Sequence, residues 1–194
     1  MAIREQAPTQ VLLRPAAGVW EIDAAHSSAS FVVRYMMVSK FRGRFTGVSG
    51  RIQIAEKPEE SRVEAAIDAA SIDTGMPPRD EHLRSPDFLD VARFPTIEFT
   101  GSPARQTGDV EFEIDGELTI RGITKPVTLK VTYGGVIPDP NFGVRASFSA
   151  AAEIDREDFE VNWNQPLEGE AVLIGRKVQI ELEISAVPAK SELA

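Results

Sequence analysis

The sequence predicts an all-β protein of eight or nine long antiparallel strands that close into a barrel, interrupted by one short helix. Apolar and polar residues alternate along most of the chain, as they do in strands that bury one face and expose the other. Glycine- and proline-rich turn signals separate these runs at short intervals. Sequential hairpins with a single helical insert fit a closed barrel better than a sandwich.

The clearest alternation lies at 109–121 and shows which side of the sheet is inside. Five acidic residues occupy one face: Asp109, Glu111, Glu113, Asp115 and Glu117. The other face carries Phe112, Ile114, Leu118 and Ile120. Five like charges must face water, so the apolar face points inward. The other strands are expected at 19–24, 28–37, 43–55, 61–72, 95–106, 124–137, 142–155 and 172–187.

The helical insert is expected at residues 79–91. A cap, a first-turn proline and an acid that suits the helix dipole occur together at Ser85, Pro86 and Asp87. Asp80 and Arg84 are four residues apart and can pair on one helical face. We expect Leu83 and Phe88 to turn inward, so that the insert caps the barrel.

Length, composition and charge limit the class of protein that this sequence can encode. The chain has 194 residues, no cysteine, 21 Lys and Arg, and 30 Asp and Glu, which gives a net charge of −9. We expect one domain at 18–188, with an extension at 1–17 and a disordered tail at 189–194. The charge disfavours nucleic acids and, for the same reason, anionic membrane surfaces. No apolar span or secretory signal is seen when Met1 is taken as the start, which predicts a soluble cytoplasmic protein.

The expected inward side chains include many aromatic rings: Phe31, Tyr35, Phe41, Phe45, Phe99, Phe112, Phe148, Phe159 and Trp163. An eight-stranded barrel is either just filled by its side chains or just wide enough for one slender ligand. Aromatic residues are ordinarily buried in a packed core, so composition favours a core. An elongated apolar pocket is the alternative.

Motifs for catalysis are missing. The sequence has no phosphate-binding loop, no nucleophile elbow and no zinc-binding histidine pair. The two histidines, His26 and His82, could hold a metal or share a proton if they met beside Asp23 or Asp80. Hydrogen-bonded structural roles are the more common outcome. We therefore predict no catalytic residue and no metal ligand.

Four motifs occur in an order that resembles the YceI-like family. The first opens with Trp20-Glu21-Ile22-Asp23, His26-Ser27 and Phe31-Val32-Val33, and continues with Phe45, Gly47, Gly50 and Ile52. The second comprises Arg79-Asp80-Glu81-His82-Leu83, Ser85, Asp87-Phe88, Asp90, Phe94-Pro95, Ile97 and Phe99. The third comprises Gly116, Leu118-Thr119-Ile120, Gly122 and Thr124-Lys125-Pro126-Val127, and the fourth Arg156, Asp158 and Phe159.

The resemblance implies a lipocalin-like barrel from a bacterial family that encloses a long apolar chain. That chain is typically a polyisoprenoid such as a polyprenyl phosphate or a quinone tail. The resemblance implies binding, transport or storage, with no cofactor and no established reaction. Exported members carry a signal peptide, which is not seen here. A glycine commonly follows the phenylalanine of the fourth motif, so we expect Glu160 to alter the bend of the strand.

On this hypothesis the ligand-binding residues are Phe31, Val33, Tyr35, Phe45, Phe88, Phe99, Phe112, Leu118, Phe148 and Trp163. Arginines near the expected rims are candidates for a phosphate head group: Arg34, Arg42 and Arg79. Two alternatives stay open. One is an enzyme that acts on a lipid-like substrate through the histidines and nearby carboxylates, and the other is a ligand-free packed barrel that acts through protein contacts. We expect no nucleic-acid partner and no integral membrane span, and a homodimer is left open.

Overall fold

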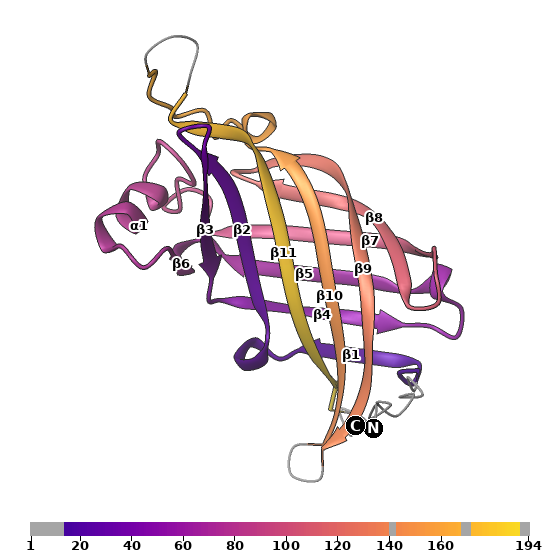
Figure 1. Cartoon of the computed structure of the whole chain (residues 1–194). Coiled ribbons are helices and arrows are strands. Elements are labelled where there is room, and N and C mark those ends of the chain that lie inside the picture. Colours follow the sequence, from indigo (N-terminus) through magenta and orange to yellow (C-terminus); the bar gives the residue numbers. More distant parts are fainter. Residues whose placement is uncertain (1–13, 140–142, 168–171, 191–194) are drawn as a thin grey trace, which may run out of the picture.

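A computed structural model describes residues 14–139, 143–167 and 172–190, which form a closed antiparallel barrel (Figure 1). Its eight strands are β1 (Gly18–Ile22), β4 (Val48–Ile54), β5 (Arg62–Asp68), β7 (Thr96–Gln106), β8 (Glu111–Ile120), β9 (Ile123–Asp139), β10 (Gly143–Asp155) and β11 (Ile174–Pro188). They pair in this order, and the ring closes because β11 pairs with β1 as well as β10. The predicted eight-stranded barrel is confirmed.

Three further strands extend the sheet beside β11. They are β2 (Ser28–Tyr35), β3 (Ser39–Phe45) and β6 (Ile72–Asp73). β1 and β2 both pair with β11, near its opposite ends, and the 3₁₀ turn η1 (Ala24–His26) separates them. Asp23 accepts a hydrogen bond from the Ala25 amide at 3.0 Å, which begins this turn. The kink lets one stretch of sequence both close the barrel and start the extension.

The helix is α1 (Pro77–Arg84), so the predicted bounds of 79–91 were wrong. Pro77 suits the first turn because its missing N–H would have no partner there. Ser85 ends the helix instead of starting it, since its hydroxyl donates to the His82 carbonyl at 2.7 Å. Residues 86–89 form turns. None of the helices in the described parts of the chain is long and apolar enough to cross a membrane.

The segment at 43–55 was predicted as one strand and is two. β3 ends at Phe45, and the turn that follows is held by Ser71: the Thr46 amide donates to its carbonyl at 3.2 Å and the Gly47 amide to its hydroxyl at 2.9 Å. The strand predicted at 61–72 likewise ends at Asp68, whose side chain begins η3 (Ala69–Ser71). β3 therefore pairs with β2 and β6, whereas β4 pairs with β1 and β5.

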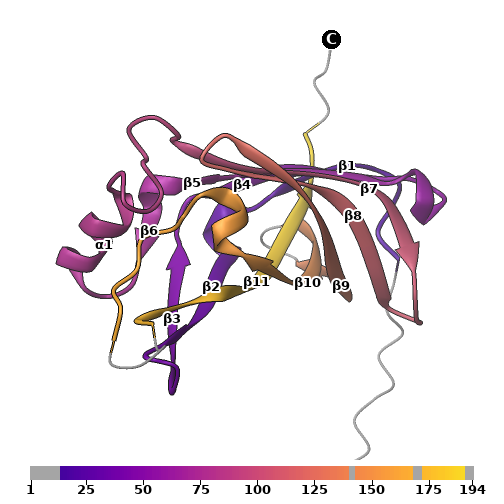
Figure 2. The ribbon, with the colours of Figure 1, turned by 90° about the horizontal axis from the view of Figure 1, so that it is seen from above.

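The remaining short turns lie at the two ends of the barrel. η2 (Pro58–Glu60) joins β4 to β5, and η4 (Arg156–Phe159) follows β10. In Figures 1 and 2, α1 lies beside one end of the barrel. Figure 2 also shows the segment that carries η4 extending from β10 toward α1. The barrel thus has one end covered by helical segments and another formed by hairpin turns.

Candidate functional site

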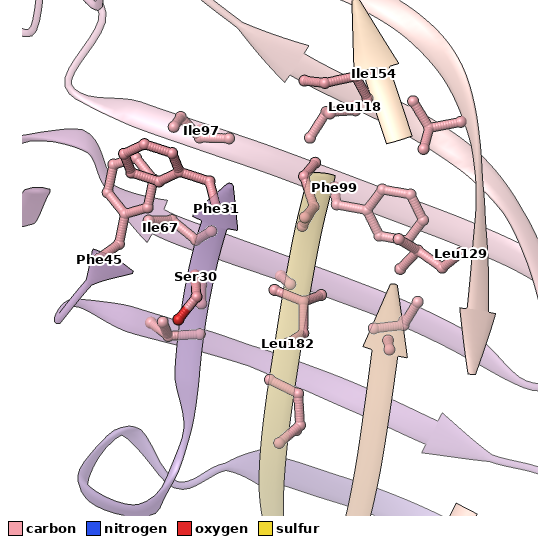
Figure 3. Close-up of a pocket in the computed structure, with 18 of the residues that line it drawn as sticks. Ser30, Phe31, Phe45, Ile67, Ile97, Phe99, Leu118, Leu129, Ile154 and Leu182 are labelled. Carbon is pink, nitrogen blue, oxygen red and sulfur yellow. The ribbon is translucent and has the colours of Figure 1, made fainter. Parts of the chain in front are cut away.

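The barrel encloses a cavity of about 980 Å³. Ligand sites for small molecules commonly span about 300–1,000 Å³, so this cavity is large for the class. Side chains from all eight barrel strands and from β2 and β3 form its wall, and most of them are apolar. In Figure 3, Leu118, Ile154, Phe99, Leu129 and Leu182 come from different strands and surround one space. The alternation of apolar residues therefore lines a hollow.

All ten residues predicted to bind the ligand line this cavity: Phe31, Val33, Tyr35, Phe45, Phe88, Phe99, Phe112, Leu118, Phe148 and Trp163. The packed core that composition favoured is not what the barrel contains. The signal that could have shown this is the presence of small residues at inward positions. Ala65, Ala104 and Ala150 face the cavity where larger side chains would have filled it.

Glycines explain how aromatic rings can line the lumen without filling it. Gly43 lies directly across from Phe31, and a Cβ added there would come within 2.4 Å of the ring. Gly101 and Gly116 also pair directly, and a Cβ on either would meet the Phe99 ring at 2.7 Å or less. The two rings thus occupy space that side chains on the wall would otherwise take. They lie against the sheet, which leaves the centre open.

Three rings meet where α1 approaches the barrel. His82 lies edge-on to Trp163 and Phe88, with ring centroids 4.8 and 5.0 Å apart, and the Phe88 and Trp163 centroids are 5.2 Å apart. All three residues line the cavity. The guanidinium of Arg121 donates to the carbonyls of Phe88 at 2.8 Å and Glu160 at 3.0 Å. The β8–β9 turn therefore holds this end of the barrel together.

The second motif attaches α1 to the sheet through three charged side chains. Arg79 donates to the Thr74 hydroxyl at 2.8 Å and to the Thr74 carbonyl at 2.9 Å. Buried Asp80 accepts from the Thr74 amide at 2.9 Å and also from the Thr74 hydroxyl. Arg84 donates to the carbonyls of Ala70 and Ile72, both at 2.8 Å. The predicted pairing of Asp80 with Arg84 is therefore wrong, because Asp80 binds Thr74 whereas Arg84 binds the backbone of η3 and β6.

Arg156 of the fourth motif is a buried cation that also lines the cavity. It donates to the carbonyls of Gly175 and Trp163, both at 3.0 Å, and to that of Val161. Burial lowers the pKa of its guanidinium, and neighbouring Glu157 opposes that change. These carbonyls belong to the segment after η4 and to the start of β11. Arg156 therefore fixes the covered end of the cavity and places positive charge there.

The three head-group candidates occupy different places. Arg34 is exposed and lies outside the cavity wall. Arg42 also lies outside it and forms an ion pair with Glu181. Arg79 lines the cavity, and its guanidinium carbon lies 4.2 Å from the centroid of the Phe41 ring. Of the three candidates, Arg79 is therefore the one that lines the cavity, and with Arg156 it places two cations at the covered end.

The opposite end is more polar. Glu56, Gln106 and Asp109 line the cavity near the β4–β5 and β7–β8 turns, as does Arg14. Tyr133 also lines the cavity, and burial raises the pKa of its phenol. The lumen is therefore mainly apolar, and its charged lining residues include Glu98 on β7, which pairs with Thr119 near the β8–β9 turn.

The two histidines lie in separate clusters. His26 Nδ1 lies 2.9 Å from Asp23 Oδ2 beside η1, whereas His82 Nε2 lies 2.8 Å from Asp87 Oδ2, just beyond the end of α1. Within residues 14–139, 143–167 and 172–190, no group of three His, Cys, Asp or Glu side chains is placed to hold a metal ion. His82 does line the cavity, which the sequence did not indicate.

The family model described as the YceI-like domain matches residues 20–186. The chain belongs to this family. It is 38% identical over 140 residues to Protein YceI of Salmonella newport, covering 72% of this chain and 73% of that protein. It is 32% identical over 145 residues to a UPF0312 protein of Pseudomonas savastanoi, covering 74% of this chain and 76% of that protein.

Two solved structures share the fold of this chain. BcnA of Burkholderia cenocepacia has a TM-score of 0.74 at 25% identity, covering 86% of this chain and 99% of BcnA. A polyisoprenoid binding domain from Saccharophagus degradans has a TM-score of 0.65 at 15% identity, covering 88% of this chain and 98% of that domain. The resemblance inferred from the four motifs is confirmed. Glu160, where a glycine was expected, adopts the left-handed conformation at φ 57°, so the bend is made without glycine.

Proposed function

We propose that the protein binds and carries a long-chain apolar molecule, of the polyisoprenoid class, inside its barrel. The observation that carries this proposal is the cavity of about 980 Å³ with a predominantly apolar wall. The same fold in Saccharophagus degradans is described as a polyisoprenoid binding domain, which supports the choice of ligand class. Membership of the YceI-like family supports binding over catalysis.

Burial of the chain supplies the affinity. Each methylene-sized group removed from water contributes about 0.8 kcal/mol, so a ligand of several isoprene units needs few polar contacts. Branched isoprenoid chains also suit a wall whose aromatic rings lie against glycines and leave an irregular lumen.

The charges at the two ends favour one orientation for an anionic ligand. Arg79 and Arg156 line the covered end together with one carboxylate, Glu98, whereas two carboxylates, Glu56 and Asp109, line the other end together with Arg14. A phosphate head group is favoured beside cations and disfavoured beside carboxylates. We therefore place the head group of a polyprenyl phosphate near α1, with its tail running toward the β7–β8 turn.

Two neighbouring alanines provide a matched test. Ala150 faces the cavity and Ala151, on the outer face of the same strand, is exposed. Ala150→Phe fills part of the lumen without burying a charge, so uptake of a fluorescent polyprenyl probe should fall by about tenfold or more. Ala151→Phe should bind the probe as the original protein does. Equal probe binding by both folded variants, checked by thermal melting, would contradict the proposal.

Native mass spectrometry of freshly purified protein tests the carrier function without an added probe. A mass excess of lipid size that disappears after organic extraction supports a carried ligand. An unchanged mass, together with no uptake of polyprenyl probe by the extracted protein, would favour a barrel that acts through protein contacts. Elemental analysis of the same sample addresses the enzyme alternative, because a stoichiometric metal lost in both His26→Ala and His82→Ala would favour a metal-dependent reaction.

A further inference from the structure

The tip of the β2–β3 hairpin exposes four consecutive apolar side chains. Tyr35, Met36, Met37 and Val38 are 41%, 46%, 51% and 87% exposed, respectively. Tyr35 also lines the cavity, as do Val33 and Phe41 on the two strands of the hairpin. The apolar surface is therefore continuous from the exposed tip into the cavity. Half-exposed Met76, just before α1, lines the same cavity.

The backbone of the tip shows that local folding does not explain these residues. Met36 and Met37 adopt the left-handed conformation, with φ of 50° and 62°. Glycine and asparagine favour this conformation in hairpin turns, whereas other side chains are strained in it. The tip is nevertheless fixed, because the Met36 amide donates to the Leu173 carbonyl at 2.8 Å and the Ser39 hydroxyl to the Tyr35 carbonyl at 3.0 Å. The hairpin holds two methionines outward in a strained, anchored turn.

Two exposed cations flank the tip on the strands of the hairpin. Arg34 and Lys40 are exposed and lie directly opposite each other across β2 and β3. Like charges in such a pair repel, and in the part of the chain that the structure describes neither has a carboxylate partner. From residue 24 to residue 55 the sequence has five Lys and Arg and no Asp or Glu, although the whole chain carries −9. The hairpin is a local cationic region with an apolar tip.

We propose that this hairpin tip docks on the surface of an anionic lipid bilayer. Met36, Met37 and Val38 enter the interfacial layer, Tyr35 lies at the level of the head groups, and Arg34 and Lys40 meet lipid phosphates. Docking brings the cavity next to the bilayer, where a long apolar chain can pass between the two without crossing water. The passage of an apolar ligand between cavity and bilayer rests on the proposed function, whereas the docking of the tip on the bilayer does not.

The net charge of the chain suggested that anionic membranes are disfavoured, and charge screening removes this objection. The Debye length is about 8 Å at physiological ionic strength, so a bilayer responds mainly to charges close to its surface. On the hairpin itself these charges are Arg34 and Lys40, whereas β8, with its acidic outer face, lies elsewhere on the barrel (Figure 1). Arg42 and Arg44, further along β3, are balanced by Glu181 and Asp73.

Vesicle flotation of the full-length protein, without any added apolar ligand, tests the docking. We expect stronger binding to vesicles of equal parts phosphatidylcholine and phosphatidylglycerol than to phosphatidylcholine alone. Val38→Asp should lower the partition coefficient on the anionic vesicles by about tenfold. Ile137→Asp is the matched control, since Ile137 is 60% exposed and lies on β9, which β10 separates from the end of β11 opposite the tip. It should leave binding unchanged.

Variants that remove charge separate the electrostatic contribution to vesicle binding from the contribution of the apolar tip. Arg34→Gln with Lys40→Gln should reduce binding to anionic vesicles only, whereas Arg62→Gln, an exposed cation on β5, should have little effect. No vesicle binding by the original protein, or equal losses for Val38→Asp and Ile137→Asp, would overturn the proposal. It would also be overturned if the tip instead mediates a dimer, seen by sedimentation as self-association that Val38→Asp abolishes.

Probe binding without vesicles distinguishes this proposal from the carrier function. Val38 lies outside the cavity wall, so Val38→Asp should take up the fluorescent polyprenyl probe in solution as the original protein does. If the original protein binds anionic vesicles through the tip but takes up no probe, the docking stands and the carrier function fails. If it takes up probe but binds no vesicles, the docking fails and the carrier function stands.

Discussion

At the scale of single residues, Gly43, Gly101 and Gly116 let two phenylalanine rings lie on the barrel wall. Gly43→Ala should push the Phe31 ring toward the lumen, because the added methyl would lie 2.4 Å from its Cζ atom. Such overpacking should lower the free energy of unfolding by about 1–3 kcal/mol and reduce probe uptake. Urea denaturation and fluorescence titration measure the two effects.

Gly134→Ala is the control for this prediction. Gly134 is exposed, and the three atoms nearest to an added Cβ all belong to Ser147, at 3.1 Å or more. It should change probe uptake little. If Gly43→Ala bound the probe as tightly as the original protein while Phe31 stayed in place, the rings would have no part in keeping the lumen open.

At the scale of elements, the attachment of α1 depends on buried Asp80. Asp80→Ala leaves the Thr74 amide without its acceptor, which should cost about 1–3 kcal/mol of unfolding free energy. Glu81→Ala on the same helix should cost about 0.5 kcal/mol or less, because Glu81 is exposed and lies 3.8 Å from Arg84. Urea denaturation compares the two, and equal losses would show that Asp80 does not anchor the helix.

At the kink between β1 and β2, the contribution of Asp23 to the stability of the fold depends on pH. Arg145 on β10, His26 and the Ala25 amide hold the pKa of Asp23 at about 2, below its usual 3.8. As pH falls, the unfolded carboxyl therefore takes up a proton before the folded one does. The stabilisation of the folded state by ionised Asp23 is therefore complete above about pH 4 and is lost as pH falls toward 2.

Asp23→Asn should consequently lower the free energy of unfolding by up to about 2 kcal/mol at pH 7, with the difference shrinking below pH 4. Urea denaturation between pH 7 and pH 2 measures it. Glu117→Gln, on the outer face of β8, is the control and should have a small effect throughout. A deficit of the Asp23 variant that stayed constant down to pH 2 would assign it to lost packing.

At the scale of the whole molecule, residues of all eight barrel strands line the cavity, so a ligand bound there should stabilise the barrel as a unit. At a free ligand concentration about 100 times Kd, linkage adds about 2.7 kcal/mol. For a chain of this size each kcal/mol raises Tm by about 2–4 °C. We expect extracted protein to melt several degrees lower than protein reloaded with polyprenyl probe. Calorimetry should show no such increase for Ala150→Phe.

The sequence by itself determined the strands, the inward faces and the family. Alternation at 109–121 places Leu118 inside and Glu117 outside because successive side chains in a strand point to opposite faces. Long strands with this pattern are predictable since the signal is local. The ends of the strands were harder to predict from the sequence. The turn after Phe45, for example, depends on Ser71, which lies far away in the sequence.

Tertiary structure alone decided whether the barrel is filled or hollow. That outcome depends on pairs such as Phe31 with Gly43, which meet only when β2 and β3 are in register. The tertiary structure also placed Arg156 and His82 at the cavity. It brought Arg34 and Lys40 opposite each other beside an exposed apolar tip. Whole-chain charge averages over such a patch, whereas a partner meets only the side chains that the fold gathers on one surface.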